Sequence, residues 1–189
     1  MNYLEIIGVA VGLIYLYWEY RANALLWLAG IVMPAIYIIV YYDAGFYADM
    51  AINIYYLAAS LYGLWFWLRK SEGGQARTIT HTPRKYIAPC VVVSVVLWVS
   101  IWWVLDRFTD STVAVGDSFT TALSVVGLWL LSRKYLEQWL VWIAVDVVCA
   151  VLYLQKDLAP TGWLYALYTI IAIFGYYKWR KMMRDDTKK

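Results

Sequence analysis

The sequence predicts an all-α integral membrane protein in which two parallel three-helix repeats are joined by one connecting helix. The chain has 189 residues, of which 63% are hydrophobic and 15% are charged, whereas a soluble domain carries about 25% charge. Its apolar runs are each about 20 residues long, enough to cross a bilayer core as a helix. In addition, residues 21–69 match residues 133–181 without a gap, at an offset of 112 positions.

The repeat is recognisable because its less common residues fall in the same register. The aligned pairs include Arg21 with Arg133, Trp27 with Trp139, Tyr56 with Tyr168, Gly63 with Gly175 and Trp67 with Trp179. Internal repeats of apolar segments are typical of transporters, in which two similar bundles can rock about a site between them.

The apolar runs are continuous, which indicates helices, because the strands of a membrane barrel would alternate over about ten residues. We expect seven spans at residues 4–20, 23–42, 47–68, 87–105, 117–131, 135–154 and 161–178. The polar linker 69–85, which contains Gly73, Gly74 and Pro83, and the polar break 106–116 flank the fourth span.

The same offset puts Glu5 on Asp117, so spans one to three match spans five to seven. One intervening span makes the two units parallel, as in the sugar-transporting SWEET proteins. The predicted parts are a first repeat (1–70), a cytoplasmic loop with the connecting helix (71–110), a second repeat (111–182) and a cytoplasmic tail (183–189).

The loop charges predict the orientation. If the first span runs inward, fourteen Lys and Arg residues lie on the inner side and two, Arg107 and Lys156, on the outer side. The positive-inside rule therefore places the N-terminus outside and the C-terminus inside. The net charge of +3 reflects this topology and does not indicate nucleic-acid binding. No cleavable signal peptide is apparent, because Glu5 interrupts the N-terminus without a basic leader.

Several function classes are excluded by what the sequence lacks. Cys90, Cys149 and His81 are too few and too dispersed for a zinc site. No phosphate-binding glycine loop with lysine is present, so no ATP motor is expected. No voltage-sensing arginine helix and no retinal-binding lysine are present either. We expect no enzyme activity, catalytic residue, metal or cofactor, and we expect a lipid membrane and a small solute as partners.

Two residue pairs at membrane depth are candidates for binding a polar solute. Asn53 and Tyr56 lie three positions apart in the third span, so they share one helix face. The amide of Asn53 needs a partner, either on another helix or on a solute. Trp139 and Trp142 share a face of the sixth span in the same way. Their rings either pack in the protein or stack on a flat cation, a contact that contributes about 0.5–2 kcal/mol.

Asp146 is the carboxylate deep inside a span. Such acids are candidates for proton relay, ion binding or attraction of a cation, although Asp146 could instead be a structural partner of hydroxyl groups. Gln138, at the inner start of the sixth span, reaches either a solute or polar headgroups. The repeat aligns Asp146 with Pro34, which removes a helix hydrogen bond and is expected to kink the second span.

Three stretches resemble one known family, the Pnu-type vitamin transporters. They are residues 47–67 (YADMAINIYYLAASLYGLWFW), 133–146 (RKYLEQWLVWIAVD) and 162–168 (GWLYALY). The resemblance covers almost the whole chain except the fourth span and the tails. It implies seven spans in a three-one-three arrangement in the bacterial cytoplasmic membrane. It also implies facilitated diffusion of an unphosphorylated B vitamin, trapping by a cytoplasmic kinase, and a homotrimer.

The resemblance also implies a binding site and a substrate. The family's Asn-x-x-Tyr and Trp-x-x-Trp pairs correspond here to Asn53, Tyr56, Trp139 and Trp142. Residues 30–37 (GIVMPAIY), which end at Tyr37, and residues 42–49 (YDAGFYAD) resemble the thiamine branch. We therefore expect thiamine as the solute and include Tyr37, Gln138 and Asp146 in its site. The alternatives are a nicotinamide riboside transporter, a proton- or sodium-coupled vitamin symporter, and a non-transporting membrane receptor.

Overall fold

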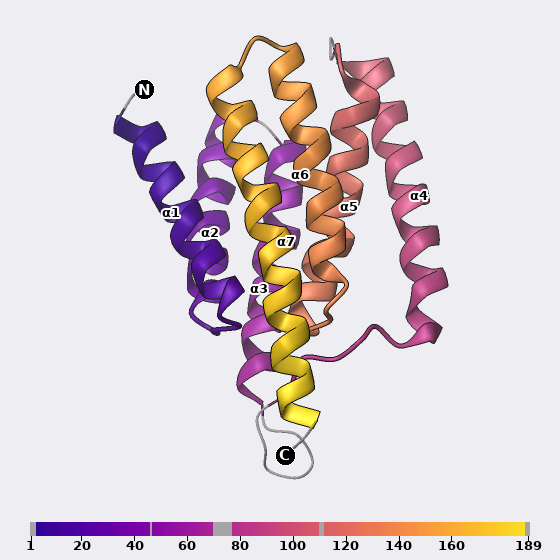
Figure 1. Ribbon diagram of the computed structural model, residues 1–189. Coiled ribbons are helices and arrows are strands. Elements are labelled where there is room, and N and C mark those ends of the chain that lie inside the picture. The colour runs from indigo at the N-terminus through magenta and orange to yellow at the C-terminus, as the bar shows by residue number, and fades with distance from the viewer. Residues whose placement is uncertain (1–2, 46, 70–76, 110–111, 188–189) are drawn as a thin grey trace. The chain divides into compact units, whose positions relative to one another are not determined.

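The computed structural model describes residues 3–45, 47–69, 77–109 and 112–187, and its described elements are all α-helices (Figure 1). They are α1 (Tyr3–Tyr20), α2 (Leu26–Ala44), α3 (Tyr47–Leu68), α4 (Arg84–Phe108), α5 (Ala114–Ser132), α6 (Gln138–Gln155) and α7 (Ala159–Thr187). The predicted all-α class is therefore confirmed. The Gly73-Gly74 part of the linker and the last two residues of the tail lie outside the described residues.

Five of the described helices, α2 to α6, are long and apolar enough to cross a membrane. The helices α1 and α7, which the sequence predicts as spans, are not among these five. Five apolar helices suffice to make this a multi-pass membrane protein, while the count of seven spans stays a prediction.

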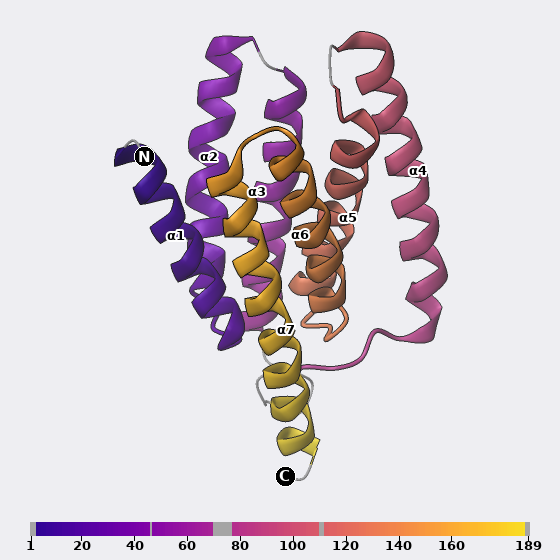
Figure 2. The same ribbon diagram turned by 45° about the horizontal axis from the view of Figure 1, so that its top comes forward.

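The chain forms two compact units, Met1–Thr78 with α1 to α3 and Ile79–Lys189 with α4 to α7. In the first unit α2 packs along α3, and α1 has a smaller contact with α2. In the second unit α5 contacts both α4 and α6, and α6 packs along α7. Figure 2 shows α7 continuing past the corner between α5 and α6. It ends at Thr187, beyond the predicted end of the span at residue 178.

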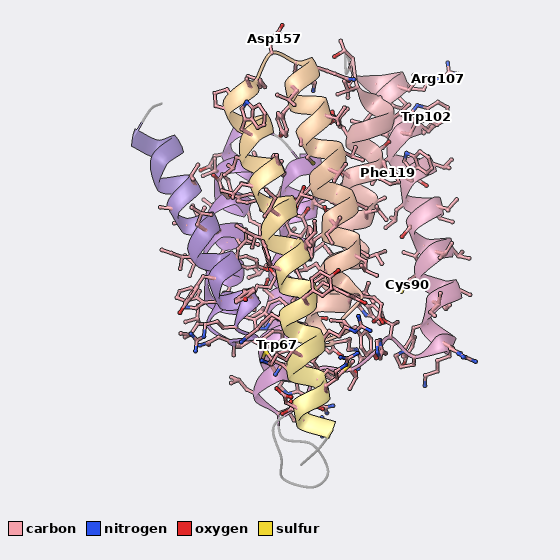
Figure 3. The ribbon with its side chains drawn as sticks, viewed as in Figure 1. Trp67, Cys90, Trp102, Arg107, Phe119 and Asp157 are labelled. Carbon is pink, nitrogen blue, oxygen red and sulfur yellow. The ribbon has the colours of Figure 1, made fainter. Side chains whose placement is uncertain are left out.

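Three residues labelled in Figure 3 mark the two ends of the second unit, and an ion pair lies at one of them. Arg107 and Asp157 lie at one end, and Cys90 lies toward the opposite end of α4 (Figure 3). At the Arg107 end, an ion pair of 3.7 Å joins Lys156 Nζ to an Asp117 carboxylate oxygen. Because both residues are partly exposed, this pair is expected to contribute no more than about 1 kcal/mol.

Backbone dihedrals repeat at the offset found in the sequence. In the described part of the chain, positive φ occurs at four residues: Ala22 (50°), Gly45 (76°), Lys134 (58°) and Asp157 (58°). They form two pairs, each separated by 112 positions. Gly45 ends α2 in the left-handed conformation, and its N–H donates to the carbonyls of Tyr41 and Tyr42, a common helix end.

A buried tryptophan joins α2 to α3 in the first unit. Trp27 is fully buried, and its ring lies edge-on to Trp67, with the ring centroids 5.6 Å apart and an interplanar angle of 88°. The α3 backbone approaches this ring at Gly63, where a Cβ would collide with the indole. Only glycine permits that approach, because it has no Cβ.

The second unit contains the same arrangement between α6 and α7. Trp139 lies edge-on to Trp179 with centroids 5.7 Å apart and an interplanar angle of 89°. A Cβ at Gly175 would lie 2.6 Å from the Trp139 ring. The aligned residues of the sequence repeat thus have matching local geometry, which supports a duplication of the helical pair.

Candidate functional site

Three of the predicted site residues form a stripe on α6. Gln138, Trp142 and Asp146 follow one another at intervals of four, and residues at that spacing lie on one face of a helix. Within α6, this grouping differs from the predicted pair Trp139 and Trp142. We call residues 138, 142 and 146 the α6 stripe.

Gln138 is the first residue of α6 and is fully buried, with 0% of its surface exposed. Neither its amide oxygen nor its amide nitrogen has a hydrogen-bond partner among the described residues. Leaving a buried polar group unpaired costs about 1–3 kcal/mol. The amide therefore keeps two donor hydrogens and one acceptor oxygen that no described residue satisfies.

The first unit provides a comparison for this residue. At the offset of the repeat, Leu26 occupies the place of Gln138, and Leu26 is also 0% exposed. An apolar side chain is what packing requires at this buried position. The amide at Gln138 is thus not needed to form the helical pair.

Trp139 has packing contacts in the second unit. It is 0% exposed and lies between Gly175 and Trp179. Trp27 makes the same contacts with Gly63 and Trp67 in the first unit. These contacts favour the packing alternative for Trp139, and stacking of a solute on its ring stays a prediction.

Trp142 is the partly exposed indole of α6. Its ring packs over α5, where a Cβ at Gly127 would lie 3.4 Å from it. Its Nε1 is buried and has no hydrogen-bond partner in the described part of the chain. The repeat aligns Trp142 with Gly30, so this ring, like the Gln138 amide, distinguishes the second unit from the first.

Asp146 is 8% exposed and lies deep within α6. On α7, Tyr165 and Tyr168 pack edge-on to each other, with ring centroids 5.7 Å apart. Tyr165 also stacks on Tyr153 of α6, with ring centroids 5.3 Å apart and an interplanar angle of 9°. The α6 stripe ends at the carboxylate of Asp146.

The tyrosines of α7 could have been predicted from the repeat. At the offset of 112, Tyr165 aligns with Asn53 and Tyr168 aligns with Tyr56. The predicted Asn-x-x-Tyr pair of the first repeat thus has a Tyr-x-x-Tyr counterpart in the second. The alignment of the repeats already pairs Tyr56 with Tyr168, and its extension from Asn53 to Tyr165 identifies the second tyrosine.

The remaining predicted site residues belong to the first unit. Asn53 and Tyr56 lie on α3 and are half-buried, and the Tyr56 ring is tilted against Tyr55 with centroids 5.9 Å apart. Tyr37, on α2, is 41% exposed and stacks on Tyr41 with centroids 5.6 Å apart. That these residues share a solute with the α6 stripe stays a prediction.

The α6 stripe combines an amide, an indole and a carboxylate. An amide pairs with hydroxyl or carboxamide groups, an indole face attracts flat rings and cations, and a carboxylate favours positive charge. Within the described ranges, no group of three or more His, Cys, Asp or Glu side chains could hold a metal ion. The stripe therefore suits binding of a flat, polar, positively charged small molecule.

The chain is similar to known membrane transporters. A family model described as "Nicotinamide mononucleotide transporter" matches residues 2–181. The chain is 21% identical to the nicotinamide riboside transporter PnuC of Escherichia coli strain K12 over an alignment of 210 positions. This alignment covers 98% of this chain and 88% of that protein. With PnuC of Haemophilus influenzae, the identity is 24% over 159 residues, which cover 82% of this chain and 69% of that protein.

A second kind of transporter and a solved structure are also similar. The riboflavin/roseoflavin transporter RibM of Streptomyces davaonensis is 25% identical over 144 residues, which cover 70% of this chain and 63% of that protein. A crystal structure of the vitamin B3 transporter PnuC superimposes with a TM-score of 0.70 at 20% identity, covering 95% of this chain and 81% of that one. This structural likeness shows that the two chains share a fold.

Proposed function

The chain belongs to the nicotinamide mononucleotide transporter family, and from this premise we propose that it takes up nicotinamide riboside by facilitated diffusion. It is a membrane transporter rather than an enzyme, as its relatives are. The observation that carries the proposal is the fully buried Gln138, whose amide groups have no partner in the described residues. The amide lies beside Trp142, whose ring departs from the repeat in the same way.

The expected substrate, thiamine, has no support from the relatives compared above. Two of them are named for nicotinamide riboside and one for riboflavin and roseoflavin. The alternative kept in the sequence analysis therefore fits better. The resemblance of residues 30–37 to the thiamine branch did not identify the substrate, and the relation of Tyr37 to the site stays a prediction.

The α6 stripe matches the chemistry of nicotinamide riboside group by group. The Gln138 amide would pair with the carboxamide or with ribose hydroxyls, which are themselves donors and acceptors. The indole of Trp142 would stack on the flat pyridinium ring, and the Asp146 carboxylate would balance its positive charge. Asn53, Tyr56 and Trp139 remain further candidates for contact with the solute.

The wider setting of this transport follows from the loop charges and from the family. We place the protein in the bacterial cytoplasmic membrane, with the N-terminus outside and the C-terminus inside. No ATP-binding motif drives the flow, so phosphorylation by a cytoplasmic kinase would keep the free solute low inside. The parallel three-one-three arrangement and the homotrimer are part of the same proposal, and the matching tryptophan pairs in the two units support the former.

Counterflow into proteoliposomes tests this function. Vesicles containing the purified protein and excess unlabelled nicotinamide riboside should accumulate labelled nicotinamide riboside without any ion gradient. Unlabelled thiamine and riboflavin, added outside in turn, should compete weakly. Accumulation that requires a proton or sodium gradient would favour the symporter. Accumulation of thiamine alone would reinstate the first expectation, and tight binding without counterflow would favour the receptor.

A further inference from the structure

A short segment of the linker is held against the corner between α5 and α6. We call residues 79–82 the strap. The side chain of Ile79 is buried, and the next residue, Thr80, forms a parallel bridge with Tyr135. The Thr80 N–H donates to the carbonyl of Lys134 at 3.2 Å, and the Leu136 N–H donates to the carbonyl of Thr80 at 2.9 Å. The strap is therefore fixed to the corner by its backbone.

The carboxylate of Glu137 binds the other half of the strap. One of its oxygens lies 2.7 Å from His81 Nδ1. The other accepts hydrogen bonds from the Thr82 N–H and the Thr82 hydroxyl, each at 2.7 Å. Hydrogen bonds that involve an ionised group are roughly twice as strong as neutral ones. Burial raises the pKa of Glu137, but the hydrogen bonds from His81 and Thr82 together have a larger, opposite effect. The pKa of Glu137 therefore lies below its ordinary value.

This carboxylate does not cap its own helix. Glu137 is the N-cap residue of α6, and its side chain makes no capping hydrogen bond; the residues that usually cap with their side chains are Ser, Thr, Asp and Asn. Its backbone carbonyl accepts from the N–H groups of Leu140 and Val141 at 3.0 and 3.3 Å. The position of Glu137 therefore sets the first turn of α6, including the adjacent Gln138.

The first unit forms the equivalent corner with a different side chain. The repeat aligns Leu25 with Glu137, and Ala22 has positive φ as Lys134 does. There the Leu25 N–H donates to the side-chain oxygen of Asn23 at 2.9 Å. A corner of this kind thus forms without a carboxylate at this position, so the bond from Glu137 to the strap serves a purpose beyond making the turn.

The strap also leads directly into the connecting helix. Pro83 is the N-cap residue of α4, and Tyr86 in the first turn of α4 lies edge-on to Trp129 of α5, with ring centroids 5.5 Å apart. Tyr86 also packs against Tyr135 in the corner, with centroids 6.5 Å apart. The strap therefore joins the first turn of α4 to the first turn of α6.

We propose that Glu137 is a positioning residue, which, held by His81 and Thr82 of the strap, fixes the first turn of α6 so that the Gln138 amide is set for the solute. The inference rests on the proposed function. Loss of the strap would let the first turn of α6 move and would weaken solute binding. The fold would be retained, because the second unit is held together by packing of α5 against α4 and α6 and of α6 against α7.

Equilibrium binding of nicotinamide riboside to the purified full-length protein tests this role. Glu137→Ala should weaken binding about tenfold, equivalent to about 1.4 kcal/mol. Glu137→Gln should recover part of the loss, because an amide oxygen still accepts from Thr82. Thr82→Val, which removes one hydroxyl donor at nearly constant volume, should give a smaller loss. Asp185→Ala, which removes an exposed carboxylate on α7, is the matched control and should bind like wild type.

The unfolding temperature of each variant distinguishes positioning from simple support of the fold. If Glu137 positions Gln138, affinity falls in Glu137→Ala and Thr82→Val while the folded fraction at the assay temperature is unchanged. Wild-type affinity in both variants would overturn the inference. If Glu137→Ala does not fold, Thr82→Val alone decides. If the wild-type protein binds no nicotinamide riboside, the proposed function fails first, and the two failures are thus distinct.

Discussion

Gln138 and Trp139 are neighbours in the chain, yet their surroundings give them different roles. The ring of Trp139 lies against Gly175 as the ring of Trp27 lies against Gly63, so this residue follows the repeat. Gln138 departs from the repeat, because the buried counterpart is Leu26. Residues that follow the repeat explain how each unit packs. Residues that break it, such as Gln138 and Trp142, are the better candidates for the solute.

The two glycines that face the tryptophans should be intolerant of a methyl group. Gly63→Ala and Gly175→Ala place a Cβ against the rigid rings of Trp27 and Trp139, and such overpacking typically costs about 1–3 kcal/mol. We expect both variants to lower the unfolding temperature, measured in detergent by intrinsic tryptophan fluorescence. Gly127→Ala is the control, because its nearest neighbour would be 3.2 Å away on Val141. An equal loss in all three variants would contradict the proposed packing role.

Asp146 should set the preference for a charged solute. Replacing the carboxylate by an amide in Asp146→Asn removes its charge at nearly constant volume. Affinity for nicotinamide riboside, whose ring is cationic, should fall by about tenfold. Affinity for the reduced riboside, whose ring is neutral, should change little. Competition binding measures both ligands on one sample, and an equal fall for the two would show that Asp146 is a structural residue.

At the scale of elements, the sequence predicts the helices well and their contacts less well. Apart from the C-terminal end of α7, which lies at Thr187 and not at residue 178, the helix bounds lie within three residues of the predicted spans, because long apolar runs between charged clusters determine them. The α6 stripe was not predicted as a unit, because Trp139 and Trp142 were paired at a spacing of three, whereas it is Trp142 and Gln138 that both depart from the repeat. The strap could not be predicted, because His81 and Glu137 are separated by 56 positions and no periodic pattern links them.

The strap should weaken in acid. Because the folded-state pKa of Glu137 is lowered, its contribution to stability is complete above its ordinary pKa of 4.5 and is lost as the pH falls through the lower folded value. The difference in unfolding temperature between wild type and Glu137→Gln should therefore be largest above pH 4.5 and shrink as the pH falls below it. A difference independent of pH over this range would mean that the carboxylate is not ionised in the strap.

At the scale of the whole molecule, the duplication of the three-helix unit underlies the predicted membrane topology. Both units contain a tryptophan–glycine contact and a corner with positive φ at aligned positions, features that a chain of unrelated helices would not share. The parallel relation of the two units stays a prediction, which rests on the single helix that separates the repeats in the sequence. The predicted orientation depends on the same argument, because an odd number of spans places the charged loops consistently.

Labelling of single cysteines in intact cells tests this topology. After Cys90 and Cys149 are replaced by serine, Asp157→Cys should react with an impermeant maleimide added outside. His81→Cys should react only after the membrane is opened. Both positions are exposed, so their reactivity reports the side of the membrane. The reverse pattern would contradict the charge-based orientation, and labelling at both sites from outside would contradict the assignment of the connecting helix.

The most direct test of the central claim is the affinity of Gln138→Leu for nicotinamide riboside, measured together with its unfolding temperature. This change gives the second repeat the side chain that the first repeat has at Leu26. The account predicts that binding is lost while the unfolding temperature stays the same or rises, because a buried amide without a partner is removed. Wild-type affinity, or a loss of binding that simply follows unfolding, would contradict the assignment of the solute site to α6.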